Sequence, residues 1–115
     1  PPSLEELIPN KQLVRVINQL VDSLAIKALE RPYRGGGPTS YHPKMMLKVI
    51  IYAYCTKSYS CRQIADSLQR DIHFMWLAAN QRPAFKTINT FRSVIIKELI
   101  EEVLGQVLTF LCEHG

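Results

Sequence analysis

The sequence predicts an all-α fold, a compact bundle of about five helices that contains a helix-turn-helix-like unit. Apolar residues recur at intervals of three and four along most of the chain, which is the helical period. Capping residues precede these segments, and prolines or turn residues follow them. At 115 residues, 47% hydrophobic and 21% charged, residues 1–115 make one globular domain with a single core.

The first two helices are short and long, respectively. Ser3 and Glu6 form a capping box for a single turn that Pro9 ends. Asn10 is placed to cap a longer helix, on which Arg15 belongs to the solvent face. Its apolar stripe comprises Leu13, Ile17, Leu20, Val21 and Leu24. We expect this helix to pack on the core and to carry no chemistry.

A glycine-rich loop separates these helices from the central one. The three glycines at 35–37 are not followed by the Gly-Lys-Ser/Thr ending of a P-loop, so we expect a connection only. Pro43 suits the first turn of the next helix, which is apolar on almost every side from Met45 to Tyr54 and should be the core helix. Lys44 at its N-terminus is a candidate phosphate contact or an ordinary solvated lysine.

The stretch from residue 60 to residue 97 predicts three helices joined by two tight connections. Ser60 and Gln63 form a capping box for the first helix. Asp71 can cap a second helix, residues 72–79, which is apolar nearly all round and should be buried. Pro83 closes the second connection, because proline cannot continue a helix.

The third of these helices, beginning near Lys86 or Thr87, carries the most informative pattern. Its apolar sector comprises Ile88, Phe91, Ile95 and Leu99. The opposite side presents Lys86, Thr90, Ser93 and Lys97, with Asn89 on its flank. Such side chains bind base edges and phosphates, although an ordinary solvated face is the alternative interpretation.

Basic charge is concentrated in the middle of the chain. Residues 31–97 carry eleven Lys and Arg against two Asp, a net of +9, within a total of +4. Residues 1–30 carry a net of −1, and residues 98–115 hold four Glu and no Lys or Arg, a net of −4. This segregation is expected of a phosphate-binding surface, and a handful of contacts predicts a salt slope of about −4 to −7 for DNA binding.

The cysteines and the absence of a long apolar run indicate a cytoplasmic protein. Cys55, Cys61 and Cys112 are odd in number and lack a Cys-x-x-Cys spacing, which favours a reducing compartment. Neither a signal peptide nor a membrane span is apparent. Because the chain starts at Pro1 without a methionine and stops just after a helical pattern, we expect it to be a piece of a longer protein.

No catalytic constellation is apparent in the sequence. Asp66 and Asp71 have ordinary surface or capping interpretations, and the histidines at 42, 73 and 114 show no metal-ligand spacing. We therefore expect no enzymatic activity and no cofactor in this piece of chain.

The final helix changes its apolar face after Leu99. The later positions are Ile96, Ile100, Val103, Leu104, Val107, Leu108 and Leu111, rotated by about 90–140° from the first stripe. Either the helix bends, with Gly105 a candidate weak point, or the second stripe meets another partner. We expect a homodimer through the C-terminal helix, on Ile100, Leu104, Leu108 and Leu111. The alternative is that the helix containing residues 13–24 covers this stripe within one monomer.

Several motifs occur in a fixed order along the chain: Gly35 to Lys48 (GGGPTSYHPKMMLK), Tyr59 to Ile64 (YSCRQI), Phe74 to Leu77 (FMWL), Arg82-Pro83 and Lys86 to Arg92 (KTINTFR). Together these motifs resemble the N-terminal domain of bacterial insertion-sequence transposases of the InsH-like type. The resemblance implies a helical module that binds the terminal inverted repeats of a mobile element, in the bacterial cytoplasm and with the nucleoid. It also implies that the DDE catalytic residues and their Mg²⁺ ions belong to a separate, following domain. Ala84 departs from the family pattern, in which an acid that could cap the helix often follows the proline.

The combined prediction is a sequence-specific double-stranded DNA-binding domain. Lys86, Asn89 and Thr90 would contact base edges, and Ser93 and Lys97 would contact phosphates. Thr87 would be a further DNA-binding residue. The backbone clamps would be Arg62, Arg70 and Arg82, with Lys44 as a further contact. If these assignments fail, Arg62 and Gln63 make the helix at 60–69 the replacement. Arg92 is left open between DNA and a pairing with Asp66 or Asp71. The rival hypothesis is a dimerisation module of a transposase without direct base readout.

Overall fold

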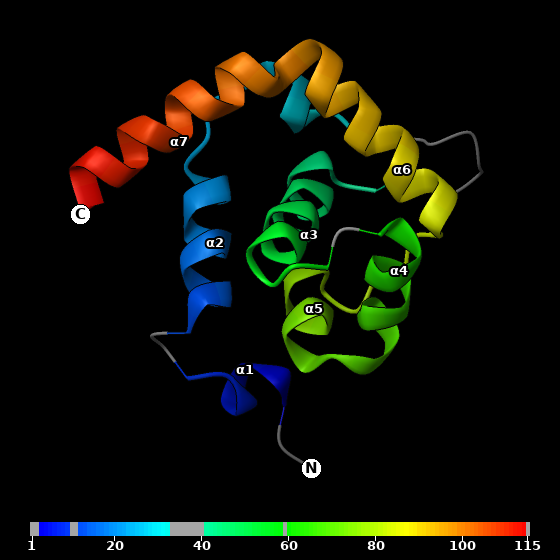
Figure 1. Ribbon diagram of the computed structural model, residues 1–115. Coiled ribbons are helices and arrows are strands. Elements are labelled where there is room, and N and C mark those ends of the chain that lie inside the picture. Colours follow the sequence, from blue (N-terminus) through cyan, green and yellow to red (C-terminus); the bar gives the residue numbers. More distant parts are fainter. Residues whose placement is uncertain (1–2, 10–11, 33–40, 59, 115) are drawn as a thin grey trace.

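The computed structural model describes residues 3–9, 12–32, 41–58 and 60–114, and it is all-α over these ranges (Figure 1). The elements are α1 (Leu4–Leu7), α2 (Leu13–Asp22), the 3₁₀ turn η1 (Lys27–Glu30), α3 (Pro43–Cys55), α4 (Cys61–Arg70), α5 (Ile72–Leu77), α6 (Phe85–Val94), the π-helical turn η2 (Ile95–Leu99) and α7 (Ile100–His114). The predicted fold class is confirmed. The glycine loop at 35–37 and the proposed cap Asn10 lie outside the described residues.

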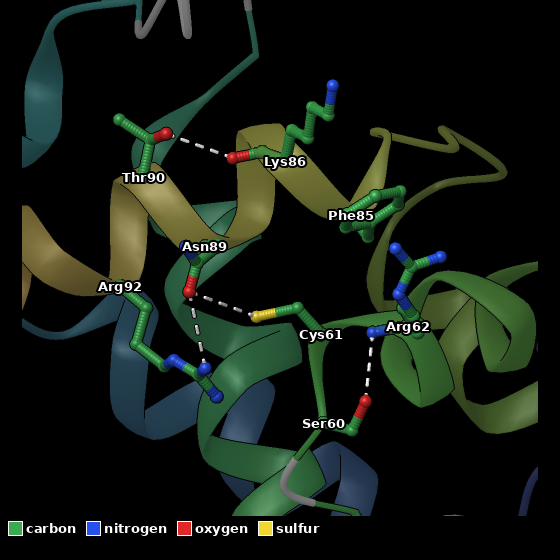
Figure 2. Close-up of a pocket in the computed structure, with 8 residues that line it drawn as sticks. All are labelled: Ser60, Cys61, Arg62, Phe85, Lys86, Asn89, Thr90 and Arg92. Carbon is green, nitrogen blue, oxygen red and sulfur yellow. Dashed lines mark hydrogen bonds between the residues drawn. The ribbon is translucent and has the colours of Figure 1, made fainter.

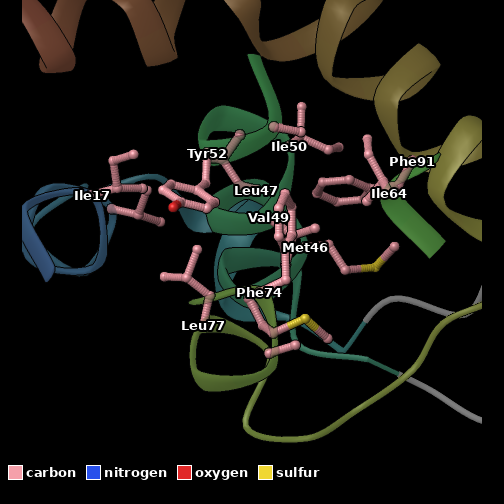
Figure 3. Packing of buried hydrophobic residues seen from close by; sticks show 14 of the residues in the cluster. Ile17, Met46, Leu47, Val49, Ile50, Tyr52, Ile64, Phe74, Leu77 and Phe91 are labelled. Atoms are coloured by element: carbon pink, nitrogen blue, oxygen red, sulfur yellow. The ribbon is translucent and has the colours of Figure 1, made fainter. Parts of the chain in front are cut away.

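The core forms around α3, as its apolar sequence predicts. Helices α2, α4, α5 and α6 all pack against it, together with η1. Its buried side chains meet others from every side, and the ring of Tyr52 contacts that of Phe74 edge-on at 5.0 Å between centroids (Figure 3). Burial raises the pKa of Tyr52, with smaller contributions from the negative charge of Asp71 and from Cys55. Tyr54 is the exception on this helix, because its side chain is exposed.

Side-chain caps fix where four of the helices begin. Ser3 Oγ accepts from the backbone N–H of Glu6, and Ser60 Oγ accepts from those of Arg62 and Gln63. Asp71 Oδ1 accepts from the N–H of His73 at 2.8 Å. The fourth cap is the Nδ1 atom of His42, which accepts from the N–H of Lys44 before α3. Each bond satisfies a donor that the first helical turn leaves without a partner.

Two burial predictions are wrong in part. Leu13 is 46% exposed, whereas Val14 is buried, because Leu13 is the first residue of α2 and side chains there point back beyond the helix end. Helix α5 ends at Leu77 rather than Ala79, and it buries only Phe74 and Leu77. Of the other α5 side chains, Ile72 is exposed, whereas His73, Met75 and Trp76 are half-buried, and Trp76 packs against the core.

Arg15 joins the N-terminal turn to the rest of the domain, although its position predicted a purely solvent face. Its guanidinium donates to Glu5 Oε1 at 2.7 Å and to the Ile8 carbonyl at 2.9 Å, and it lies 4.9 Å from the Trp76 ring centroid. Trp76 Nε1 donates to Glu5 Oε2 at 2.8 Å. These contacts hold α1 against α2 and α5.

The last helical rod, α6–η2–α7, arches over the other helices (Figure 1). Ile88, Phe91 and Ile95 face the core as predicted, and Val103 and Phe110 continue that buried face. Eight residues separate Ile95 from Val103, whereas two α-helical turns need about 7.2. The wider π turn takes up the difference, so the register changes at η2 and α7 runs through Gly105 as an α-helix.

The predicted second stripe is consequently divided. Val103 is buried and Val107 is half-buried, so these two members of the stripe belong to the core of the monomer. The five other members stay exposed: Ile96, Ile100, Leu104, Leu108 and Leu111. Helix α2 therefore does not cover the stripe within the monomer. Among the described residues, none of the helices is both long and apolar enough to cross a bilayer.

Candidate nucleic-acid interface

An open polar cleft of about 550 Å³ lies where the N-terminus of α4 meets the outer face of α6 (Figure 2). It is lined by Ser60, Cys61, Arg62, Phe85, Lys86, Asn89, Thr90 and Arg92. The two helices pack on each other through buried residues, Cys61 and Ile64 on α4 and Ile88 on α6. Because each helix buries one stripe, the polar residues beside those stripes are turned outward together.

Arg62 is held in a defined position on one wall. Its guanidinium carbon lies 4.1 Å from the centroid of the Phe85 ring, so the two planes form a cation–π contact between α4 and α6 (Figure 2). A stacked guanidinium keeps its N–H groups available at its edge for phosphate oxygens. The contact therefore presents a cation to the cleft at a low cost in side-chain freedom.

Asn89 of α6 lies near the centre of the cleft, between Cys61 of α4 and Arg92 (Figure 2). Its Oδ1 accepts from Arg92 Nη2 at 3.4 Å and faces the Cys61 thiol at 3.9 Å (Figure 2). Arg92, left open by the sequence, lines this cleft. Its two suggested partners have contacts of their own, since Asp66 pairs with Arg70 at 2.9 Å and Asp71 bonds His73.

The two hydroxyl groups of α6 bond to their own helix. Thr90 Oγ1 donates to the Lys86 carbonyl at 2.9 Å, and Ser93 Oγ donates to the Asn89 carbonyl at 3.1 Å. With the proton used in this way, each oxygen still offers lone pairs. The Thr90 hydroxyl, which lines the cleft, therefore suits a donor such as a base amino group, whereas Ser93 is not among the residues that line it.

The structure brings four of the sequence-predicted residues into the cleft and leaves the others outside its lining. Arg62, Lys86, Asn89 and Thr90 line it. Thr87 and Ser93 belong to α6, and Lys97 lies one helical turn further on, in η2. The exposed residues Gln63 and Arg82 lie on α4 and before α6.

Two predicted backbone contacts have carboxylate partners instead. Lys44 Nζ lies 3.0 Å from Glu30 Oε1 and 3.3 Å from the Asp22 carbonyl, and the lysine side chain is 13% exposed. Arg70 pairs with Asp66 in the next turn of α4, on an exposed face. Neither belongs to the residues that line the cleft.

Sequence analysis missed Ser60, Cys61 and Phe85 as parts of this site. Ser60 was identified as a cap, and Phe85 fell just before the predicted start of α6. Helix α6 begins at Phe85 after Ala84, and Ala84 makes no side-chain cap, as its identity predicted. The pairing of Arg62 with Phe85 joins residues far apart in the chain, so no local pattern could have revealed it.

Metal binding has no candidate site among the described residues, since no three His, Cys, Asp or Glu side chains gather there. Glu5, which lies outside the cleft, has a lowered pKa. The hydrogen bond from Trp76 and then that from Arg15 lower the pKa of the Glu5 carboxyl.

Comparison with known proteins identifies the family. No curated protein and no solved structure matches the chain. One family model, described as a transposase domain (DUF772), matches residues 2–94, which end with the last residue of α6. Because the match covers most of the 115 residues, the chain belongs to this transposase-domain family.

Proposed function

We propose that this domain binds double-stranded DNA through the cleft and the outer face of α6, and that it recognises the terminal inverted repeats of an insertion sequence during transposition. Membership of the transposase-domain family supports a role in transposition. The observation that carries the proposal is that three cationic side chains, Arg62, Lys86 and Arg92, line one open cleft together with the amide of Asn89, to which Arg92 donates. Cations and an amide in this arrangement suit phosphates beside base edges.

Helix α6 has the dimensions required of a recognition helix. Its ten residues extend for about 15 Å, and a helix with its side chains fits the major groove, which is about 12 Å wide. In the proposal Asn89 meets a base edge and Thr90 accepts from a base amino group. Lys86, for which the sequence predicts a base contact, neutralises a phosphate at the edge of the groove. Asn89 is the residue best suited to adenine, whose edge offers one acceptor and one donor.

Arg62 would clamp a phosphate from the α4 side of the same groove. Ser93 and Lys97 follow along the rod, where the DNA backbone would leave the groove. The acidic residues after position 97 would keep the DNA from extending along α7, since that segment has a net charge of −4.

The proposal places catalysis elsewhere. The family resemblance implies that strand transfer, with its carboxylates and Mg²⁺, belongs to a separate domain, and that the protein acts in the cytoplasm on nucleoid DNA. The present domain would recognise the terminal inverted repeats of the element. A homodimer through the C-terminal helix would hold two element ends together.

Selection of duplexes from a random pool tests the proposal directly. The domain should enrich one sequence, and it should bind the selected duplex at least tenfold more tightly than a scrambled duplex of equal composition. Lys86→Ala should weaken both complexes, whereas Asn89→Ala should narrow the difference between them. Absence of enrichment together with salt-independent binding would exclude the proposal and favour the dimerisation module without base readout.

A further inference from the structure

A continuous apolar stripe remains uncovered along η2 and α7. Ile96, Ile100, Leu104, Leu108 and Leu111 are between 36% and 61% exposed, although Val103 and Phe110 on the same rod are buried. Single exposed leucines are ordinary on protein surfaces. A row of five aliphatic side chains along about 22 Å of helix is an interaction surface.

An apolar groove adjoins the first half of this stripe. It has a volume of about 250 Å³ and lies between α3 and the η2–α7 segment. The residues around its mouth include Ile50, Ile51, Tyr54, Ile96, Ile100 and Leu104. Leu108 and Leu111 lie beyond the groove, on the part of α7 that extends away from α3 (Figure 1). The chain therefore carries an open apolar groove and, beside it, a pair of protruding apolar side chains.

The spacing of the stripe is nearly the same in both directions. Ile96, Ile100, Leu104 and Leu108 follow at intervals of four, and Leu111 comes three later. Reversal about Leu104 exchanges Ile100 with Leu108 and brings Ile96 close to Leu111. An antiparallel copy of α7 therefore presents a matching row, as the self-complementary interface of a two-fold dimer requires.

We propose that this face joins two copies of the chain, with α7 antiparallel to the α7 of the partner and the two-fold axis near Leu104. Leu108 lies about 12 Å along the helix from Ile100, so Leu108 and Leu111 of each copy reach the groove of the other. The inference goes beyond DNA recognition, because it concerns a face that the α4–α6 cleft does not use.

The apolar area favours a second copy as the occupant, and the charge disfavours two other occupants. Five aliphatic side chains and a groove from each of two copies bury on the order of 1,000 Å², about the minimum for a specific interface. DNA and anionic lipid are poor occupants, because residues 98–115 have four Glu and no Lys or Arg. By wheel position, Glu102 and Glu113 lie away from the stripe, whereas Glu101, about 60° from Leu104, borders it. The two-fold pairing therefore places Glu101 at the rim of the interface and not on its axis.

Sedimentation equilibrium between 1 and 100 µM tests the association. The wild-type domain should sediment at twice 13.2 kDa, and Leu104→Glu should sediment at 13.2 kDa because it places two carboxylates on the axis. Thr109→Glu is the matched control, since Thr109 is exposed on another side of α7 and the variant should remain dimeric. Circular dichroism checks that each variant is folded. A wild-type monomer at 100 µM would overturn the proposal.

Disulfide cross-linking tests the geometry without destabilising substitutions. In a Cys55→Ser, Cys112→Ser background, which removes the two exposed thiols, Leu104→Cys should cross-link to itself under mild oxidation. Thr109→Cys should not. Equal cross-linking of the two variants would refute the proposed axis. Duplex binding is measured separately on the same samples, so a dimer that binds no DNA would contradict the proposed function alone.

Discussion

The cations that line the cleft determine how strongly salt should weaken DNA binding. Arg62, Lys86 and Arg92 line it, and Arg92 also donates to Asn89 there. Lys44 and Lys48 are not among its lining residues, and they have carboxylate partners at 3.0 and 2.7 Å. Each phosphate neutralised contributes about −0.9 to the slope of log K against log[salt]. Three contacts give a slope of about −2.7, which weakens binding about 40-fold between 50 and 200 mM salt. This is shallower than the basic composition alone suggests.

Lys86→Ala should remove one of these three contributions. The expected slope is about −1.8, and binding should then weaken only about 12-fold over the same range of salt. Lys44→Ala is the matched control, because that ammonium group is already paired with Glu30 and lies outside the cleft. Its slope should stay near the wild-type value.

Fluorescence anisotropy of a labelled duplex provides the measurement. Dissociation constants at five salt concentrations from 50 to 300 mM determine each slope. A Lys86→Ala slope equal to that of the wild type would refute the placement of phosphates in the cleft. The placement would also be refuted if the slope of log K against log[salt] for Lys44→Ala were about 0.9 shallower than that of the wild type.

Three further predictions concern specificity, stability and pH. Asn89→Ala should reduce discrimination between selected and scrambled duplexes by about 1–3 kcal/mol in competition assays, whereas Ser93→Ala, whose hydroxyl bonds the Asn89 carbonyl, should change it little. Phe91→Ala should lower the free energy of unfolding in urea by about 3–5 kcal/mol, because the ring is 2% exposed; Leu13→Ala, at a residue 46% exposed, should cost far less, and equal losses would contradict the assigned core. Glu5 has a lowered pKa, so its contacts with Trp76 and Arg15 stabilise α1 above about pH 4.5 and are lost as pH falls through that lowered value. Trp76→Phe removes the indole N–H, and NMR titration should then show a higher pKa for Glu5; an unchanged value would exclude the hydrogen bond as its main cause.

Local sequence determined where most helices begin and which face each one buries. Ser60 and Asp71 could be assigned as caps because a capping bond joins residues two or three positions apart. The buried row of Ile88, Phe91 and Ile95 followed from the helical period in the same way. The polar face of α6 was therefore predictable, since it is what this row leaves outside.

Tertiary structure alone decided which of those polar residues line one cleft. The contact of Arg62 with Phe85 and the ion pair of Lys44 with Glu30 join different elements, and no periodicity encodes such pairs. These contacts placed Arg62 in the cleft and Lys44 outside it.

The segment from α6 to α7 shows most clearly what the sequence determines and what the tertiary structure decides. Its sequence contains two apolar stripes, and the period alone predicted that one straight helix could not bury both. Where the register changes depends on how α6 and α7 fit the same core, and the structure places that change at η2 rather than at Gly105. The π turn keeps Val103 and Phe110 on the core and turns Leu104 and Leu108 away from it, because one extra residue in a turn rotates everything after it.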